Sequence, residues 1–170
     1  MKLYPDFYLN NILDITIPFL KENNIQGLIL DVDNTLIDFD KRLLEGAENW
    51  VQMLKEEGIR LCILSNSNQK EKVEKVATKL QIPYFYFAKK PLKSGFKKAK
   101  EILELENKQI AAVGDQIFTD VIGANHSHMI SILVKPIGEK DIWITKVKRP
   151  LEKAIIRKGK KKGKNQKGTE

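Results

Sequence analysis

Five short apolar runs alternate along this 170-residue chain with longer, charged segments of helical character. The runs cover residues 27–30, 60–64, 84–87, 110–113 and 130–134. Each is almost free of charge, as expected of strands that are covered on both faces, and the alternation is typical of βαβ units. The sequence therefore predicts an α/β fold: a three-layer, doubly wound parallel sheet of five strands.

Helices are predicted between these runs, where apolar residues recur at a spacing of three or four. They are expected around residues 50–54, 73–80 and 96–103, and after Thr119. Near the N-terminus, Tyr8, Ile12, Ile15 and Phe19 would line one face of a helix that Pro18 divides into two short pieces.

The charge of the chain is concentrated at its C-terminal end. The net charge is +8, yet residues 1–145 contain 19 basic and 20 acidic residues. From Lys146 onward, 11 Lys or Arg stand against two acids. We expect a single domain over 1–158, with an N-terminal helical segment, and a disordered basic tail over 159–170. The tail could serve as a solubilising end, a contact for RNA or another nucleic acid, or an attachment to anionic membrane.

Several classes of protein are disfavoured by composition. The longest stretch without Asp, Glu, Lys or Arg is 121–134, too short for the roughly 20 residues of a transmembrane segment. The N-terminus does not resemble a signal peptide, so we expect a cytoplasmic protein, with peripheral contact at the inner membrane face as an alternative. Cys62 is the single cysteine, which rules out an intrachain disulfide and argues against a thiolate metal cluster.

Polar residues follow four of the five runs. Asp31 and Asp33 come directly after the first run, two positions apart, so that in extended backbone they point to the same side. The carboxyl ends of strands in an open α/β sheet are where ligands bind. The later runs are followed by Ser65-Asn66, by Lys89-Lys90-Pro91, and by Gly114-Asp115 with Asp120 five residues on. Helix caps and turns would explain any one of these acids, but not four polar groups placed consistently.

The chemistry of this set is that of phosphoryl transfer. Clustered carboxylates near 4 Å repel by roughly 4 kcal/mol per pair at an effective dielectric constant of 20, which calls for a divalent cation. Oxygen ligands alone favour magnesium over zinc. A carboxylate is a competent nucleophile at neutral pH, so one acid could attack a phosphorus atom while another handles protons.

These motifs resemble those of the haloacid-dehalogenase-like phosphatases, with Asp31-Val32-Asp33-Asn34-Thr35, Ser65, Lys90 and Gly114-Asp115 through Asp120 in order. The resemblance implies that Asp31 forms an aspartyl-phosphate and that Asp33 acts as general acid and then as base. Lys90 would offset charge on the nucleophile and the phosphate. It is preferred to Lys89 because the family's lysine commonly precedes proline, and Lys93 is a weaker candidate.

The same resemblance implies the binding groups. Thr35, Ser65 and Asn66 would serve substrate binding, with Ser65 on the phosphoryl group and Thr35 bracing the nucleophile loop. Mg²⁺ would be held by Asp31, Asp115 and the carbonyl of Asp33, and Asp120 would support it directly or through water.

A closer likeness, over residues 5–157, is to the YqeG subfamily and its relatives, the phosphatidylglycerophosphate phosphatases. The likeness rests on residues 31–36, Ser65-Asn66, 88–91, 114–121, Gly123 and 132–134. Where Gly-Gly-Asn-Arg followed by glycine is expected, this chain has His126 and His128, which we interpret as surface or loop residues rather than a metal pair.

Spacing favours an enzyme without a cap domain. Thr35 and Ser65 are 30 residues apart, and Ser65 and Lys90 are 25 apart, which a strand and its linking helix nearly fill. The expected site is open and suits a phosphate on a large partner. We therefore predict an Mg²⁺-dependent phosphomonoesterase, with a phosphatidylglycerophosphate-like lipid headgroup as preferred substrate. The alternatives are a phosphatase for a nucleotide, phosphoprotein or nucleic-acid end, or a non-catalytic RNA- or ribosome-associated factor.

Overall fold

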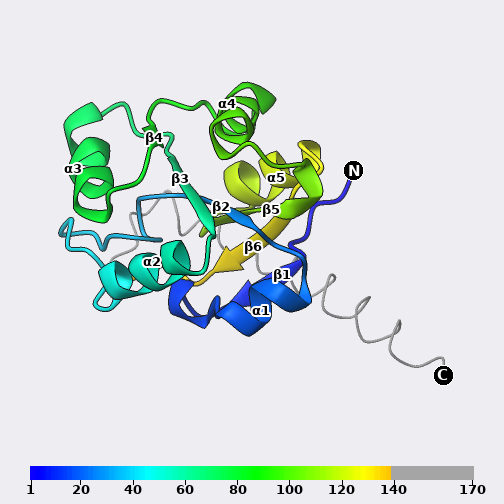
Figure 1. Ribbon diagram of the computed structural model, residues 1–170. Coiled ribbons are helices and arrows are strands. Elements are labelled where there is room, and N and C mark those ends of the chain that lie inside the picture. The colour runs from blue at the N-terminus through cyan, green and yellow to red at the C-terminus, as the bar shows by residue number, and fades with distance from the viewer. Residues whose placement is uncertain (139–170) are drawn as a thin grey trace.

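The computed structural model describes residues 1–138, which form a parallel sheet of six strands flanked by helices (Figure 1). The strands are β1 Phe7–Leu9, β2 Gly27–Leu30, β3 Arg60–Leu64, β4 Tyr84–Phe85, β5 Ile110–Gly114 and β6 Ile130–Val134. Their order across the sheet is β1-β6-β5-β2-β3-β4. The predicted α/β class is confirmed, and each of the five apolar runs contains a strand; the third is two residues shorter than predicted.

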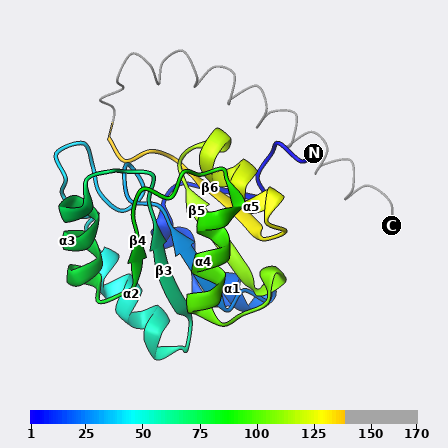
Figure 2. The same ribbon diagram turned by 90° about the horizontal axis from the view of Figure 1, so that it is seen from above.

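Helices cover both faces of the sheet, as the two views in Figures 1 and 2 show. They are α1 Ile17–Glu22, α2 Ala47–Glu56, α3 Lys70–Leu80, α4 Lys93–Leu103 and α5 Ile122–His126. Short helical turns lie at Ile12–Asp14, Asn107–Gln109 and Ile117–Val121. The helices α1 to α3 pack on one face and α4 and α5 on the other, which makes the predicted three layers.

Alternation along β2 shows how one strand serves both layers. Leu28 and Leu30 are buried in the cluster that includes Trp50 of α2 and Val73 of α3, whereas Ile29 is buried in the cluster around Phe96 of α4. Successive side chains of a strand point to opposite faces, so an uninterrupted apolar run is needed when both faces are covered.

The N-terminal segment differs from the prediction. Tyr8 lies in β1, a sixth strand that pairs with β6, instead of on a helix, so the predicted count of five strands is one too few. Two short helical pieces are present, as predicted, at Ile12–Asp14 and in α1, but the break between them precedes Pro18. Pro18 lies in the first turn of α1, where a backbone N–H has no partner within the helix and its absence costs nothing. Thr16 caps this turn by accepting a hydrogen bond from the Phe19 N–H at 3.3 Å.

A polar network fastens this added strand to the sheet. The side chain of Asp6 accepts hydrogen bonds from the Ser131 backbone N–H at 2.9 Å and from its hydroxyl at 3.1 Å. The amide of Asn125 donates to the carbonyls of Lys2 and Tyr4. These contacts span more than 120 residues of sequence, which is why local periodicity did not reveal the strand.

The chain direction across the sheet reverses beside β2. From β2 the chain continues outward to β3 and β4, then returns to β5 on the other side of β2 and continues to β6. Ligands of open α/β sheets bind at such a switch point, outside the carboxyl ends of the strands. Asp31 follows β2 directly and Asp115 follows β5 directly, so the fold brings these two acids to the switch point.

Between the motif residues, residues 31–120 contain only the loops, helices and strands already named, and no inserted domain. None of the helices in residues 1–138 is long and apolar enough to cross a membrane. The predicted helix after Pro150 and the basic tail 159–170 lie outside the described residues, so the domain limits 1–158 and 159–170 stay predictions.

The buried thiol of Cys62 gives a test of this core. Cys62 is fully buried beneath α4, and burial raises its pKa to about 12. At pH 8 the side chain is therefore an uncharged, inaccessible thiol. We expect no reaction with 5,5′-dithiobis(2-nitrobenzoate) in the native protein and one thiol per chain after unfolding in guanidinium. Rapid stoichiometric reaction of the native protein would contradict the placement of β3.

Candidate active site

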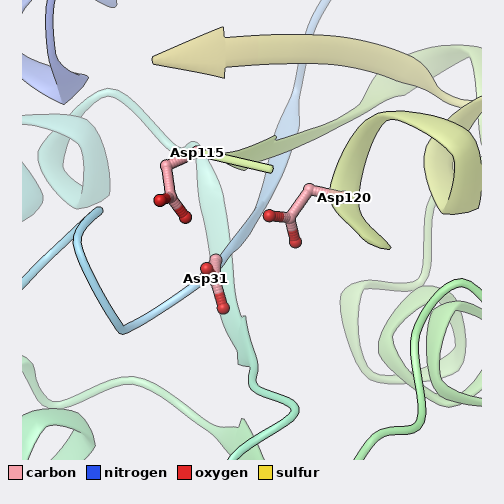
Figure 3. A group of neighbouring side chains, drawn as sticks. All are labelled: Asp31, Asp115 and Asp120. Carbon is pink, nitrogen blue, oxygen red and sulfur yellow. The ribbon is translucent and has the colours of Figure 1, made fainter. Parts of the chain in front are cut away.

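Three acids converge at the carboxyl ends of β2 and β5 (Figure 3). Asp31, Asp115 and Asp120 each offer a carboxylate oxygen, and these oxygens lie within 4.8 Å of one another. Asp120 comes from the helical turn Ile117–Val121, which starts two residues beyond Asp115. The ends of two strands and one helical turn thus build a single cluster from residues up to 89 positions apart in sequence. We call this cluster the acidic triad.

Gly114 makes room for this cluster. A Cβ atom at this position would lie 2.1 Å from Cγ and 2.2 Å from Oδ2 of Asp120, far inside contact distance. The same carboxylate accepts a hydrogen bond from the Gln116 backbone N–H at 3.3 Å. The glycine is therefore required for close approach of the Asp120 side chain to the end of β5.

Lys90 lies among the acids. Its Nζ is 3.0 Å from Oδ1 of Asp31 and 2.6 Å from Oδ1 of Asp120, and its side chain is buried. Lys89 is exposed and lies over the Phe87 ring, with Nζ 5.1 Å from the centroid, while Lys93 is exposed at the start of α4. Of these three lysines, the structure brings Lys90 to the acidic triad.

One lysine does not balance the three carboxylates of the acidic triad. Burial raises the pKa of Asp31 well above its usual value, the charges of Asp120 and Asp115 raise it further, and Lys90 only partly opposes them. Burial lowers the pKa of Lys90, but Asp120 and Asp31 raise it by more, so this lysine stays charged. A divalent cation among the triad oxygens would restore balance and ionise Asp31, and an all-oxygen donor set suits a hard cation. The residues present therefore fit a metal.

Asp33 is placed apart from the triad. Its carboxylate accepts two hydrogen bonds from Nζ of Lys72 on α3, at 2.8 and 3.0 Å, and its side chain is 47% exposed. The Asp33 carboxylate does not belong to the acidic triad. The sequence predicts a metal contact for the backbone carbonyl of Asp33, not for its carboxylate. Sequence analysis did not identify Lys72, because α3 contains four lysines at similar spacing and nothing distinguishes this one.

The predicted phosphate-binding residues lie at the end of β3 and in the loop after β2. Ser65 is buried, and its hydroxyl accepts a hydrogen bond from the Ser67 N–H at 3.1 Å. The side chain of Asn66 accepts from the Lys90 N–H at 2.6 Å and donates to the Lys90 carbonyl at 3.0 Å, so it positions the lysine loop. Thr35 is buried, and its hydroxyl has no hydrogen-bond partner within residues 1–138.

The two histidines stand away from this chemistry. His126 at the end of α5 and His128 just after it are exposed, and neither belongs to the acidic group that could hold a metal in the described part of the chain. Their interpretation as surface or loop residues is consistent with these positions.

Comparison with known proteins gives relatives over most of the chain. Residues 39–128 match the haloacid dehalogenase-like hydrolase family. The "Probable phosphatase YqeG" of Bacillus subtilis is 38% identical over 164 residues, which covers 94% of this chain and 92% of that protein.

Solved structures share the fold at low identity. An uncharacterized protein from Listeria monocytogenes gives a TM-score of 0.55 at 20% identity, covering 69% of this chain and 85% of its own. The cobalt-bound deoxy-D-mannose-octulosonate 8-phosphate phosphatase of Haemophilus influenzae gives 0.52 at 17% identity, covering 70% of this chain and 83% of its own.

Removal of the buried lysine tests the charge balance of the triad. In Lys90→Met, Asp31 and Asp120 lose the ammonium group with which both are paired, so we expect the free energy of unfolding in EDTA to fall by about 3 kcal/mol. Because the net charge of the acidic triad and residue 90 together becomes more negative, Mg²⁺ should raise Tm by more in this variant than in the parent. Urea unfolding and thermal scans measure both effects. Lys89→Met is the matched control; equal stability of Lys90→Met and the parent in EDTA would contradict the ion pairs.

Filling the space at Gly114 tests the position of Asp120. In Gly114→Ala, the added methyl group must displace the Asp120 carboxylate, which loses its place beside Lys90 and Asp31. We expect Mg²⁺ affinity, measured by isothermal titration calorimetry, to fall about 10- to 100-fold, the range seen when metal ligands lose their support. Far-UV circular dichroism verifies folding. Unchanged affinity in a folded variant would show that Asp120 is not needed for the cation.

Proposed function

This chain belongs to the haloacid dehalogenase-like hydrolase family and is a phosphatase, and from that premise we propose that it hydrolyses phosphomonoesters through an aspartyl-phosphate on Asp31. The observation that carries the proposal is the contact of Asp31 with Lys90 inside the acidic triad, at the switch point of the sheet. A carboxylate held there by a cation can face the phosphorus atom of a bound phosphate ester.

In the first step, an oxygen of the Asp31 carboxylate attacks phosphorus and the bond from phosphorus to the ester oxygen breaks. The departing oxygen takes a proton from Asp33 and leaves as an alcohol. Two hydrogen bonds from Lys72 occupy the carboxylate of Asp33, so one of them must open before Asp33 can carry that proton. The half-exposed side chain of Asp33 leaves it room to do so.

In the second step, Asp33 takes a proton from a water molecule as the water oxygen attacks phosphorus. The bond between Asp31 and phosphorus breaks, which releases inorganic phosphate and restores the Asp31 carboxylate. Asp33 is again protonated for the next cycle, so one residue serves both half-reactions.

The remaining residues hold charge in place. Lys90 offsets negative charge on Asp31 and on the phosphoryl oxygens, and Ser65 at the end of β3 binds the phosphoryl group. The Asn66 side chain orients Lys90 through hydrogen bonds to the Lys90 N–H and carbonyl. Thr35 braces the loop after β2 through its backbone, since its N–H donates to the Val32 carbonyl at 3.2 Å.

We propose Mg²⁺ as the cofactor, held by Asp31, Asp115 and the carbonyl of Asp33, with Asp120 in support. When bound, the cation neutralises phosphate oxygens and keeps Asp31 ionised. The oxygen-only donor set supports this choice, and a phosphatase of similar fold is known in a cobalt-bound form.

For the substrate we propose a phosphatidylglycerophosphate-like lipid, and hence a role in phospholipid metabolism. The resemblance to phosphatidylglycerophosphate phosphatases supports this assignment, as does the 47% exposure of Asp33, which suits a bulky ester. Cytoplasmic localisation, and contact of the basic tail with anionic membrane or RNA, remain predictions. The acidic triad and Asp33 give no reason to prefer a nucleotide, phosphoprotein or nucleic-acid end, and the phosphatase kinship disfavours a non-catalytic factor.

Replacement of the nucleophile tests the mechanism. We expect Asp31→Asn to lower kcat for p-nitrophenyl phosphate at least about 1,000-fold, because an amide cannot form the aspartyl-phosphate. EDTA should abolish activity of the parent, and Mg²⁺ should restore it. Glu101→Gln, an exposed acid on α4, is the matched control for loss of one negative charge. Equal rates in Asp31→Asn and the parent would disprove the nucleophile assignment.

A further inference from the structure

A groove of about 850 Å³ runs between the segment 37–43 and α3, and none of the acids of the triad lines it. The segment lies beside α3 in both views of the fold (Figures 1 and 2). Its wall includes the buried apolar residues Ile37 and Val76, so it offers space for the carbon skeleton of an organic molecule.

The polar side chains of this groove are almost all cationic. Six basic residues line it against a single acid, Glu71: Lys41, Arg42, Lys70, Lys72, Lys75 and Lys79. Within residues 1–138, Lys41, Lys70 and Lys75 form no ion pair, whereas Lys79 lies 3.3 Å from Glu48 and Arg42 lies 3.7 Å from Asp40. Lysines at 72, 75 and 79 share one face of α3, where like charges repel. An anion in the groove would offset that repulsion.

Lys72 connects this groove to the chemistry. It lines the groove, and its Nζ lies 2.8 Å from the carboxylate of Asp33, the group assigned to protonate the departing oxygen. The ester oxygen must reach Asp33, so whatever is attached to that oxygen continues toward the groove.

We propose that the groove is the binding site for the leaving group and that this leaving group carries a second phosphate, as a monoester or a diester. This inference rests on the proposed function, because it places the leaving group relative to Asp31 and Asp33. Lys70 and Lys75, which line the groove from α3 and form no ion pair within residues 1–138, bind the second phosphate, with Lys41 as a further cation from the segment 37–43. A phosphate ester with an uncharged leaving group uses none of these contacts.

Two matched substrate pairs test the proposal. The soluble pair is glycerol 1,3-bisphosphate against glycerol 1-phosphate, and the lipid pair is phosphatidylglycerophosphate against phosphatidic acid in mixed micelles. We expect the member with the second phosphate to have at least about tenfold higher kcat/KM in one or both pairs, and the pair that responds identifies a soluble or lipid source. Equal kcat/KM within both pairs would overturn the inference.

Variants assign the preference to the groove. Lys70→Gln combined with Lys75→Gln should lower the ratio of kcat/KM within the responding pair about tenfold. Lys97→Gln combined with Lys108→Gln removes the same charge from exposed positions outside the groove and should leave that ratio unchanged. A ratio unaffected by the groove variant, or equally reduced by the control, would overturn the assignment.

The two proposals fail in different ways. A parent protein that hydrolyses p-nitrophenyl phosphate but shows no preference in either pair retains the proposed function and loses the groove assignment. A parent protein that hydrolyses none of these esters with Mg²⁺ overturns the proposed function and the groove assignment together.

Discussion

The burial of Lys90 between Asp31 and Asp120 is the interaction on which the rest of the site depends. Three carboxylates would not collect at one edge of a sheet without a cation, and burial makes their mutual repulsion stronger than it would be in water. The lysine keeps them together at the cost of an incomplete charge balance. A further cation would complete that balance, so the ion pairs that hold the acids together also suit the site to the proposed chemistry.

The backbone around these ion pairs is organised to keep them in register. Asp31 continues the sheet, since its N–H donates to the Val113 carbonyl at 3.0 Å, and this ties the end of β2 to the end of β5. Asn66 fastens the Lys90 loop through two hydrogen bonds, and Gly114 leaves the space that the Asp120 side chain fills. The contacts of Asp31 with Val113 and of Asn66 with Lys90 join segments far apart in sequence, so the site is a property of the assembled sheet rather than of any one motif.

The sequence was sufficient to predict what depends on local pattern. Apolar runs located β2 to β6, because strands buried on both faces need such runs. Polar residues after those runs identified the acids and Lys90. Three features escaped. The strand β1 depends on Asp6 and Asn125 contacts across the sheet, Lys72 is indistinguishable from its neighbours on α3, and the basic groove combines a loop with a helix face. All three arise from tertiary contacts, which periodicity and spacing do not encode.

The two ends of the site carry opposite excess charge. At the buried end, three acids and one lysine leave an excess of negative charge, whereas along the groove six cations and one acid leave an excess of positive charge. The ion pair of Asp33 and Lys72 lies at the border and contributes one residue to each side. A divalent cation would offset the negative charge of the acids, and a second anionic group on the leaving side of the ester would offset the positive charge of the groove. An ester without that second anionic group leaves the positive charge of the groove unopposed, which is the physical reason to expect discrimination between the two kinds of ester.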